Sequence, residues 1–265
     1  MIADDRIPAA AQALFDGARQ RAKLTGLPPD LEPADMAEAY AAQAVLQRLW
    51  QEAGAGAVAG WKVALTSPVM QQLVGVSQPC EGAIFARRIH ESPARLNHGE
   101  FVNPGVESEI AVRLAKDLPA GAGPYHRHSV ADAVGEVMPA IELVDDRAMD
   151  YAKITPGLLI ADNAWNAGCV LGPPCPHWRE LDLAALAGRM EINGETVGEG
   201  VGGDALGHPF EPLAWLANNL NDRGLQLNAG DVVMTGSIVA TKWLNAGDRM
   251  ATIIDELGAA RLELV

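Results

Sequence analysis

The feature that most constrains the fold is an abrupt change of pattern at Val58. From there onward, short runs rich in Val, Ile and Leu alternate with Gly and Pro, whereas the preceding residues repeat apolar side chains at helical spacing. Such runs are typical of strands, and spacings of three and four residues are typical of helices. The pattern predicts an α+β protein, with a helical amino-terminal segment over 1–55 docked on a mostly antiparallel or mixed β domain over 56–265.

The individual elements follow from the same pattern. Strands are expected over 58–65, 83–85, 106–114, 137–144, 167–171, 189–192, 231–235, 249–254 and 261–265. Further helices are expected over 129–136 and 209–222, and Asn193-Gly194 predicts a tight hairpin. The chain has no internal repeat and no glycine motif for a dinucleotide or a phosphate.

The net charge of the chain excludes some classes of binding partner. The formal net charge of −14 argues against binding to nucleic acid or to anionic lipid, both of which need a basic face. The three cysteines form no CxxC pair, and no apolar stretch is long enough to serve as a signal core or to span a bilayer. We therefore expect a cytoplasmic protein that acts on a small molecule.

Two glutamates stand two residues apart in the expected strand 106–114. Successive side chains of a strand alternate between faces, so Glu107 and Glu109 share one face while Ser108, Ile110, Val112 and Leu114 fill the other. A third acid, Glu142, lies in an apolar run that reads as buried. Converging carboxylates suit a hard divalent cation such as Mg²⁺ or Mn²⁺. The alternative is a solvated strand face on which Arg113 pairs with the acids.

Lys62 and the segment Thr235-Gly236-Ser237 are further candidates for a site. Lys62 either extends to solvent or lies in a pocket beside the metal, where it would hold an anionic group or move a proton. Hydroxyl groups and freed N–H groups after the strand 231–235 suit a carboxylate, although an ordinary strand exit has the same composition. Asp162, Asn163 and Asn166 are either turn residues or groups that support the site.

Together these stretches resemble the hydratase/decarboxylase branch of the fumarylacetoacetate hydrolase superfamily, and within it the 2-keto-4-pentenoate hydratases. The matching stretches occur in family order: GWKVALTS at 60–67, GVSQP at 75–79, GVESEIAVRLAKDLP at 105–119, VMPAIELVDDR at 137–147, ADNAWNAG at 161–168, GHP at 207–209, DVVMTGS at 231–237 and NAGDR at 245–249. They span most of the chain from residue 60 onward.

The resemblance implies a site, a fold and an assembly. It implies that Glu107, Glu109 and Glu142 hold Mg²⁺ or Mn²⁺, that Lys62 is an active-site residue, and that Thr235, Gly236 and Ser237 help to bind the carboxylate end of the substrate. It also implies a mixed β-roll with a helical amino-terminal extension, a homo-oligomer, and association with a decarboxylase of the same pathway.

One position departs from the family pattern. The resemblance leads us to expect an aspartate after Gln78-Pro79, but the chain has Cys80 there, followed by Glu81. A thiol transfers protons near neutral pH only if its pKa is depressed. Glu81 is therefore the candidate replacement for proton transfer, although its side chain starts one position later.

The resemblance leaves the reaction open among relatives that share an enolate intermediate. The first choice is addition of water to a 2-hydroxy-2,4-dienoate or 2-oxo-enoate, giving a 4-hydroxy-2-oxo acid. The alternatives are decarboxylation of a 2-oxo-3-enedioate, cleavage of an acylpyruvate, and a noncatalytic partner subunit. A second cationic group in the pocket would favour a diacid, and an apolar wall would favour a short alkyl or alkenyl tail.

Overall fold

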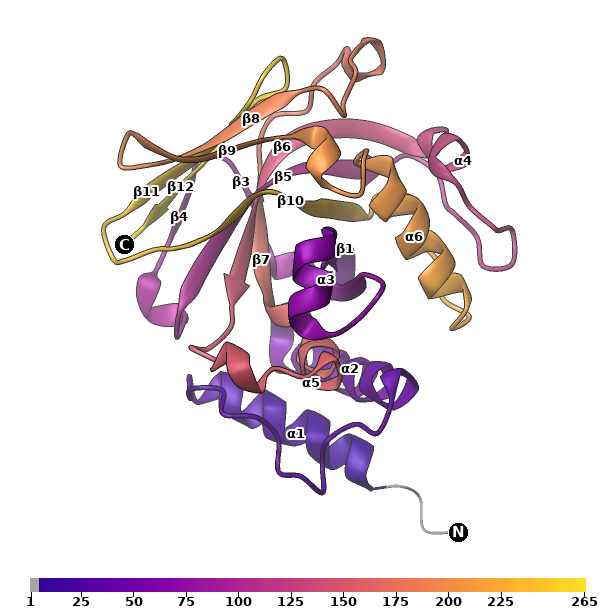
Figure 1. The fold of residues 1–265 in the computed structure, drawn as a ribbon, viewed down its shortest axis with the longest axis vertical. Coiled ribbons are helices and arrows are strands. Elements are labelled where there is room, and N and C mark those ends of the chain that lie inside the picture. The colour runs from indigo at the N-terminus through magenta and orange to yellow at the C-terminus, as the bar shows by residue number, and fades with distance from the viewer. Residues whose placement is uncertain (1–4) are drawn as a thin grey trace.

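The computed structural model describes residues 5–265, and two packed β-sheets form its centre (Figure 1). The larger sheet has the order β2-β1-β10-β5-β6-β7-β3 and the smaller has the order β4-β12-β11-β8-β9. The strands of the larger sheet are β1 (Val58–Ala64), β2 (Cys80–Phe85), β3 (Ile89–Glu91), β5 (Pro104–Leu114), β6 (Val134–Asp145), β7 (Asn166–Leu171) and β10 (Val232–Trp243). The strands of the smaller sheet are β4 (Ala94–Leu96), β8 (Ala187–Ile192), β9 (Glu195–Val201), β11 (Arg249–Ile254) and β12 (Gly258–Leu264).

Both sheets are mixed, as expected. The pairs β1–β10, β3–β7 and β4–β12 are parallel, whereas the other neighbouring strands are antiparallel. The predicted hairpin at Asn193-Gly194 is confirmed, since both residues have positive φ between β8 and β9. The structure therefore has the predicted α+β class.

The principal core lies between the two sheets. Ile110 of β5 is buried in one cluster with Met250 of β11 and Leu262 of β12. The hydroxyl groups of Ser108 of β5 and Thr252 of β11 form a hydrogen bond of 2.8 Å across this interface. Because these residues occupy one face of β5, Glu107 and Glu109 must occupy the other.

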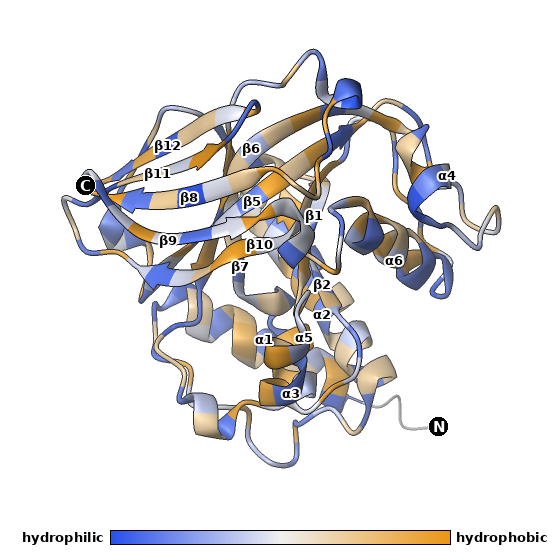
Figure 2. Ribbon diagram, turned by 45° about the horizontal axis from the view of Figure 1, so that its top comes forward, coloured by the Kyte–Doolittle hydropathy of each residue, from blue (hydrophilic) through white to orange (hydrophobic). Residues whose placement is uncertain are grey.

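The α-helices within residues 5–265 are α1 (Arg6–Arg19), α2 (Met36–Trp50), α3 (Pro68–Val74), α4 (Arg127–Ala131), α5 (Pro156–Ala161) and α6 (Phe210–Asn221). The helices α1, α2 and α5 lie together at one end of the molecule, and α4 and α6 lie on another side (Figure 1). Figure 2 shows apolar residues on α5 and on the adjoining part of α1. These helices form a second core cluster, which contains Leu14, Leu46 and Ile160. No helix within residues 5–265 is long and apolar enough to cross a membrane.

The helix starts follow from local sequence. The carboxylate of Asp35 accepts the N–H of Glu38 at 2.9 Å, which caps α2. Thr155 caps α5 in the same way, with Pro156 in the first turn. These short-range signals begin helices whose stability comes mainly from the apolar cluster they share.

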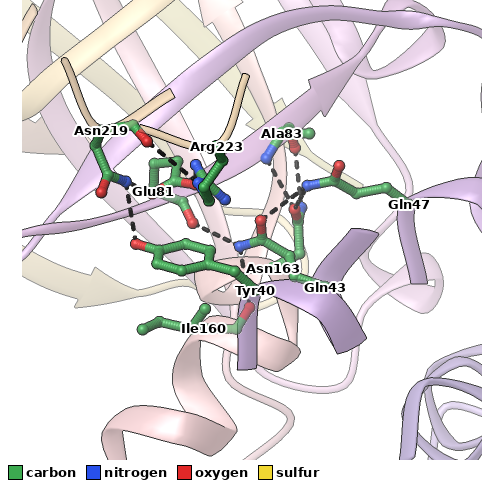
Figure 3. Close-up of polar contacts among 9 residues, drawn as sticks. All are labelled: Tyr40, Gln43, Gln47, Glu81, Ala83, Ile160, Asn163, Asn219 and Arg223. Carbon is green, nitrogen blue, oxygen red and sulfur yellow. Dashed lines mark hydrogen bonds and ion pairs between the residues drawn. The ribbon is translucent and has the colours of Figure 1, made fainter. Parts of the chain in front are cut away.

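Side-chain amides cover the open edge of β2, which is the outermost strand of the larger sheet (Figure 3). Gln43 of α2 donates to the carbonyl oxygens of Glu81 at 2.7 Å and of Ile160 at 3.0 Å. Asn163 accepts from the N–H of Ala83 at 2.8 Å and donates to the carbonyl oxygen of Ala83 at 2.9 Å. These bonds satisfy backbone groups that a neighbouring strand would otherwise satisfy.

Two predicted elements differ from the structure. The predicted helix 129–136 ends early, as α4, because Val134 and Glu136 pair with the long strand β5 and so begin β6. The predicted strand 231–235 continues as β10 to Trp243, because shifts of register let it follow β5 beyond Gly236. Short elements such as α3, α5, β3 and β4 were not predicted.

Candidate active site and metal centre

The three predicted acidic residues converge on one face of the larger sheet. Glu107 of β5 lies directly opposite Glu142 of β6, and Glu109 follows two residues later on β5. One carboxylate oxygen from each lies within 4.8 Å of the others. Glu109 and Glu142 are fully buried, and Arg113 pairs with Glu136 at 3.0 Å, so the solvated-face alternative is wrong.

The electrostatics of this cluster favour a cation. The Oε1 atom of Glu109 and the Oε2 atom of Glu142 are buried without a hydrogen-bond partner among the described residues. Burial raises the pKa of Glu107, and the charge of Glu142 raises it further. Burial, Glu142 and Glu107 together raise the pKa of Glu109 well above its usual range. Buried carboxylate oxygens without hydrogen-bond partners fit the oxygen preference of a hard divalent cation.

Neighbouring groups orient two of these carboxylates. The N–H of Gly236 donates to Oε2 of Glu109 at 2.8 Å. The amide of Asn166 donates to Oε1 of Glu142 at 3.1 Å, so Asn166 contacts the acidic cluster. In each carboxylate, the oxygen that is held is not the orphaned one. The protein therefore leaves one oxygen of each residue available to a cation.

The segment around Gly236 is only partly in its predicted place. The hydroxyl of Thr235 is fully buried and donates to the carbonyl oxygen of Ile110 at 2.7 Å, so the prediction that it binds substrate is not supported. Ser237 lines the adjoining cavity. Further along β10, Thr241 lines the same cavity and donates to Glu107, a contact that the sequence analysis missed.

Lys62 lies beside the acidic cluster rather than in solvent. Its Nζ atom is 3.1 Å from Oε1 of Glu142, and its side chain is 5% exposed. Burial alone would lower the pKa of Lys62, but the charges of Glu142 and Glu107 outweigh burial and raise it. Lys62 is therefore an ammonium group near neutral pH, and it lines the cavity next to the cluster.

Cys80 occupies the face of β2 that is directed toward Lys62. In the antiparallel register of β1 and β2, Cys80 lies opposite Ala64, two residues beyond Lys62 on the same strand face. Burial raises the pKa of the thiol to about 12, although Lys62 opposes that shift. The thiol therefore stays protonated at neutral pH and cannot accept a proton as a thiolate base.

Glu81 does not join the site, which corrects the prediction that it transfers protons. Being one residue from Cys80, it points to the opposite face of β2, where it is fully buried. Figure 3 shows its carboxylate between Arg223, with which it forms an ion pair, and Asn219, whose amide donates to it at 2.7 Å. Glu81 thus ties β2 to α6, where Asn219 lies, and to Arg223 just beyond that helix.

A cavity of about 340 Å³ opens beside the cluster. Its polar end is lined by Lys62, Glu107, Ser237 and Thr241. Much of the remaining wall is apolar and includes Val69, Met70 and Val74 of α3 together with Ile154, Leu159 and Trp165. Among the described residues that line it, Lys62 is the one cationic side chain. The arrangement suits a small acid with a charged head and an apolar tail.

The chain matches a known protein family and is similar in sequence to two named hydratases. Residues 86–265 match the model of the family described as fumarylacetoacetate (FAA) hydrolase C-terminal. The chain is 34% identical over 261 residues to the 2-keto-4-pentenoate hydratase of Paraburkholderia phymatum, covering 97% of each protein. It is equally 34% identical, over 259 residues and 97% of each, to the 2-hydroxyhexa-2,4-dienoate hydratase of Comamonas testosteroni.

A solved structure resembles the chain over its whole length. The 4-oxalocrotonate decarboxylase from Pseudomonas putida G7, complexed with magnesium and adipate, superimposes with a TM-score of 0.92 at 27% identity. The alignment covers 100% of this chain and 99% of that one. The fold and the arrangement of elements are therefore shared with a protein crystallised with a divalent cation.

Proposed function

The chain belongs to the fumarylacetoacetate hydrolase superfamily, in its hydratase branch, and from this premise we propose that it is a metal-dependent hydro-lyase. The proposed substrate is a short 2-hydroxy-2,4-dienoate or the 2-oxo-enoate formed from it. The product is a 4-hydroxy-2-oxo acid. Relatives named for these dienoates support the assignment, and such acids arise when aromatic compounds are degraded through ring cleavage.

The observation that carries this choice is the single cation in the cavity wall. Lys62 can pair with one carboxylate at the polar end, and the apolar wall of α3, Ile154 and Leu159 offers no cation for a second. Burying an unpaired carboxylate there would be costly. The cavity thus favours a monoacid over the diacid of a decarboxylase, although the similarity to the decarboxylase makes that reaction the second candidate.

The acidic cluster supplies the metal site of this proposal. Glu107, Glu109 and Glu142 would hold Mg²⁺ or Mn²⁺, supported by their orphaned oxygens and by the magnesium in the related decarboxylase. When bound, the metal supplies Lewis acidity that makes the 2-oxygen of the substrate a better electron acceptor. Gly236 and Asn166 keep the carboxylates of Glu109 and Glu142 in orientation.

The protein's own residues bind the acid and transfer protons. Lys62, held as an ammonium, attracts the substrate carboxylate and can donate a proton from Nζ. Hydration removes the proton from the 2-hydroxyl group of the dienol and places one on C5, and then adds hydroxide from water to C4 and a proton to C3, so the sum is addition of one water molecule. Ser237 and Thr241 present hydroxyl groups at the same end of the cavity. The apolar wall limits access of other water molecules.

The decisive assay compares two substrates with the metal-loaded protein. We expect loss of the ultraviolet absorbance of 2-hydroxypenta-2,4-dienoate, and no CO₂ from 2-oxohex-3-enedioate. Release of CO₂ from the diacid without hydration of the dienoate would replace the proposal with the decarboxylase. Glu107→Gln should abolish turnover, whereas the matched variant Glu195→Gln, at an exposed position on β9, should keep it. Unchanged turnover of Glu107→Gln would contradict a catalytic metal at this cluster.

We further predict the oligomeric state of the protein, its association with another enzyme and its cellular compartment. The resemblance leads us to expect a homo-oligomer and association with a decarboxylase of the same pathway. Light scattering of the purified protein and its co-elution with such a decarboxylase test these expectations. The free, buried state of Cys80, Cys169 and Cys175 supports a reducing compartment, the cytoplasm.

A further inference from the structure

A second cavity of about 220 Å³ adjoins the first, and its lining is chemically different. Arg87, Arg88, Arg147 and His90 contribute to its wall, whereas the substrate cavity has only Lys62 as a cation. Within residues 5–265, Trp165 is the one residue that lines both cavities. Trp165 therefore lies between a mostly apolar space and one lined by these basic residues together with the acids Glu100, Asp145 and Asp162.

The backbone holds this partition between the two cavities in a fixed position. Asn163, Ala164 and Trp165 have φ values of 55°, 49° and 57°, an uncommon run of left-handed residues without glycine. Asn163 anchors the run through its two bonds to Ala83, and Trp165 packs edge-on against Tyr151 with the ring centroids 5.7 Å apart. The indole Nε1 has no hydrogen-bond partner among the described residues, so packing and backbone alone position the ring.

Arg88 gives the second cavity a free binding group. Its guanidinium lies 4.3 Å from the ring centroid of Trp50 and makes no hydrogen bond or ion pair to another described residue. Asp145, which also lines this cavity, interacts electrostatically with Arg88, but its oxygens already accept the backbone N–H groups of residues 102 and 103 at 2.8 and 2.9 Å. A planar guanidinium with unused N–H donors is well suited to bind a carboxylate.

We propose that Trp165 is a specificity-determining residue: it closes the substrate cavity and so restricts the enzyme to acids with short uncharged tails. This proposal rests on the proposed function. A smaller side chain at position 165 would join the two cavities, and a carboxylate at the far end of the substrate would then reach Arg88. The wild-type protein selects against dicarboxylic substrates because the indole separates them from the cation that would bind them.

The test uses the Mg²⁺-loaded protein with 2-hydroxypenta-2,4-dienoate and its dicarboxylic counterpart, 2-hydroxyhexa-2,4-dienedioate. We expect Trp165→Ala to shift the ratio of kcat/KM toward the dicarboxylate by about tenfold or more, and Trp165→Phe to retain the wild-type ratio. Adding Arg88→Met to Trp165→Ala should remove the gain. Arg88→Met alone should leave turnover of the short dienoate unchanged, since Arg88 lies behind the partition.

An unchanged ratio in folded Trp165→Ala would overturn the proposal, as would a gain that survives Arg88→Met. If the alanine variant fails to fold, Trp165→Leu replaces it in the same comparison. If no variant and no wild-type protein hydrates the short dienoate, the proposed function fails, and calorimetry decides about the partition separately. In that case tighter binding of adipate relative to pentanoate by Trp165→Ala than by wild type supports the partition, and equal preference refutes it.

Discussion

Replacing Asn163 with alanine tests how the left-handed run next to the site is held. The substitution removes the carboxamide that bonds to both backbone groups of Ala83, and it removes an acceptor for Gln47 at 3.2 Å. It also places a residue with a Cβ and no local hydrogen-bonding group at a φ of 55°. Ala83 is fully buried, so water cannot replace the lost bonds.

The expected loss of stability follows from these contacts. Each of the two bonds to Ala83 leaves a buried backbone group unsatisfied, which costs about 1–3 kcal/mol. Alanine in the left-handed region costs about 1 kcal/mol more, a strain that asparagine tolerates better. The sum is about 3–7 kcal/mol, a large fraction of the roughly 5–15 kcal/mol that stabilises a typical protein. Glycine at the same position loses the bonds but avoids most of the strain, so Asn163→Gly should lose about 1 kcal/mol less than Asn163→Ala.

Urea titration of the two variants and the wild type, without metal, measures these free energies of unfolding. The order of stability should be wild type, then Asn163→Gly, then Asn163→Ala, with similar m-values throughout. If Asn163→Ala lies within about 1 kcal/mol of wild type, the amide bonds to β2 contribute little and the reasoning is refuted. If the glycine variant is the less stable of the two, backbone strain at this position is not a significant cost.

Three further outcomes are expected. Glu81→Gln should lower the free energy of unfolding by about 2–3 kcal/mol. This is less than the loss of a fully buried ion pair, because the side chain of Arg223 is 25% exposed. The kcat of the folded variant should stay unchanged, and a selective loss of kcat would restore the catalytic role of Glu81. Lys62→Met should lower kcat/KM at least about 100-fold without preventing metal binding, and near-normal turnover would exclude Lys62 from proton transfer. Calorimetric affinity for Mg²⁺ should rise as the pH is raised, with proton release, because the raised pKa of Glu109 lets protons compete with the metal at lower pH; an affinity independent of pH would contradict this.

The strand period accounts for the part of the site that could be predicted. Glu107 and Glu109 lie in a long strand with a mostly apolar opposite face, so alternation alone assigns their direction. Glu142 could be added because an isolated acid within a buried run needs a partner. The position of Lys62 was left open by its sequence, and the curl of the larger sheet, which no local pattern specifies, brings it to Glu142.

Other residues depend on geometry that the sequence does not display. Glu81 was assigned to the site although a shift of one residue along a strand reverses the face, which is the reason that it meets Arg223 instead. The direction of Thr235 depends on register shifts between β10 and β5. The conformation of Trp165 depends on the side-chain amide of Asn163, which bonds to Ala83, 80 positions away in the chain. Composition and spacing therefore could not reveal it.

The amide-covered edge of β2 has a consequence for shortened forms of the protein. Gln43 belongs to α2, and Asn163 leads into the strand that carries Asn166, so the same edge depends on two distant parts of the chain. A variant that starts at Val58 would keep every proposed metal ligand and the bonds of Asn163 to Ala83, yet it would expose the part of β2 that Gln43 covers, where another molecule could pair through its backbone. We expect such a variant to self-associate and precipitate, which makes the first two helices an internal protection against aggregation as well as a cover for the core.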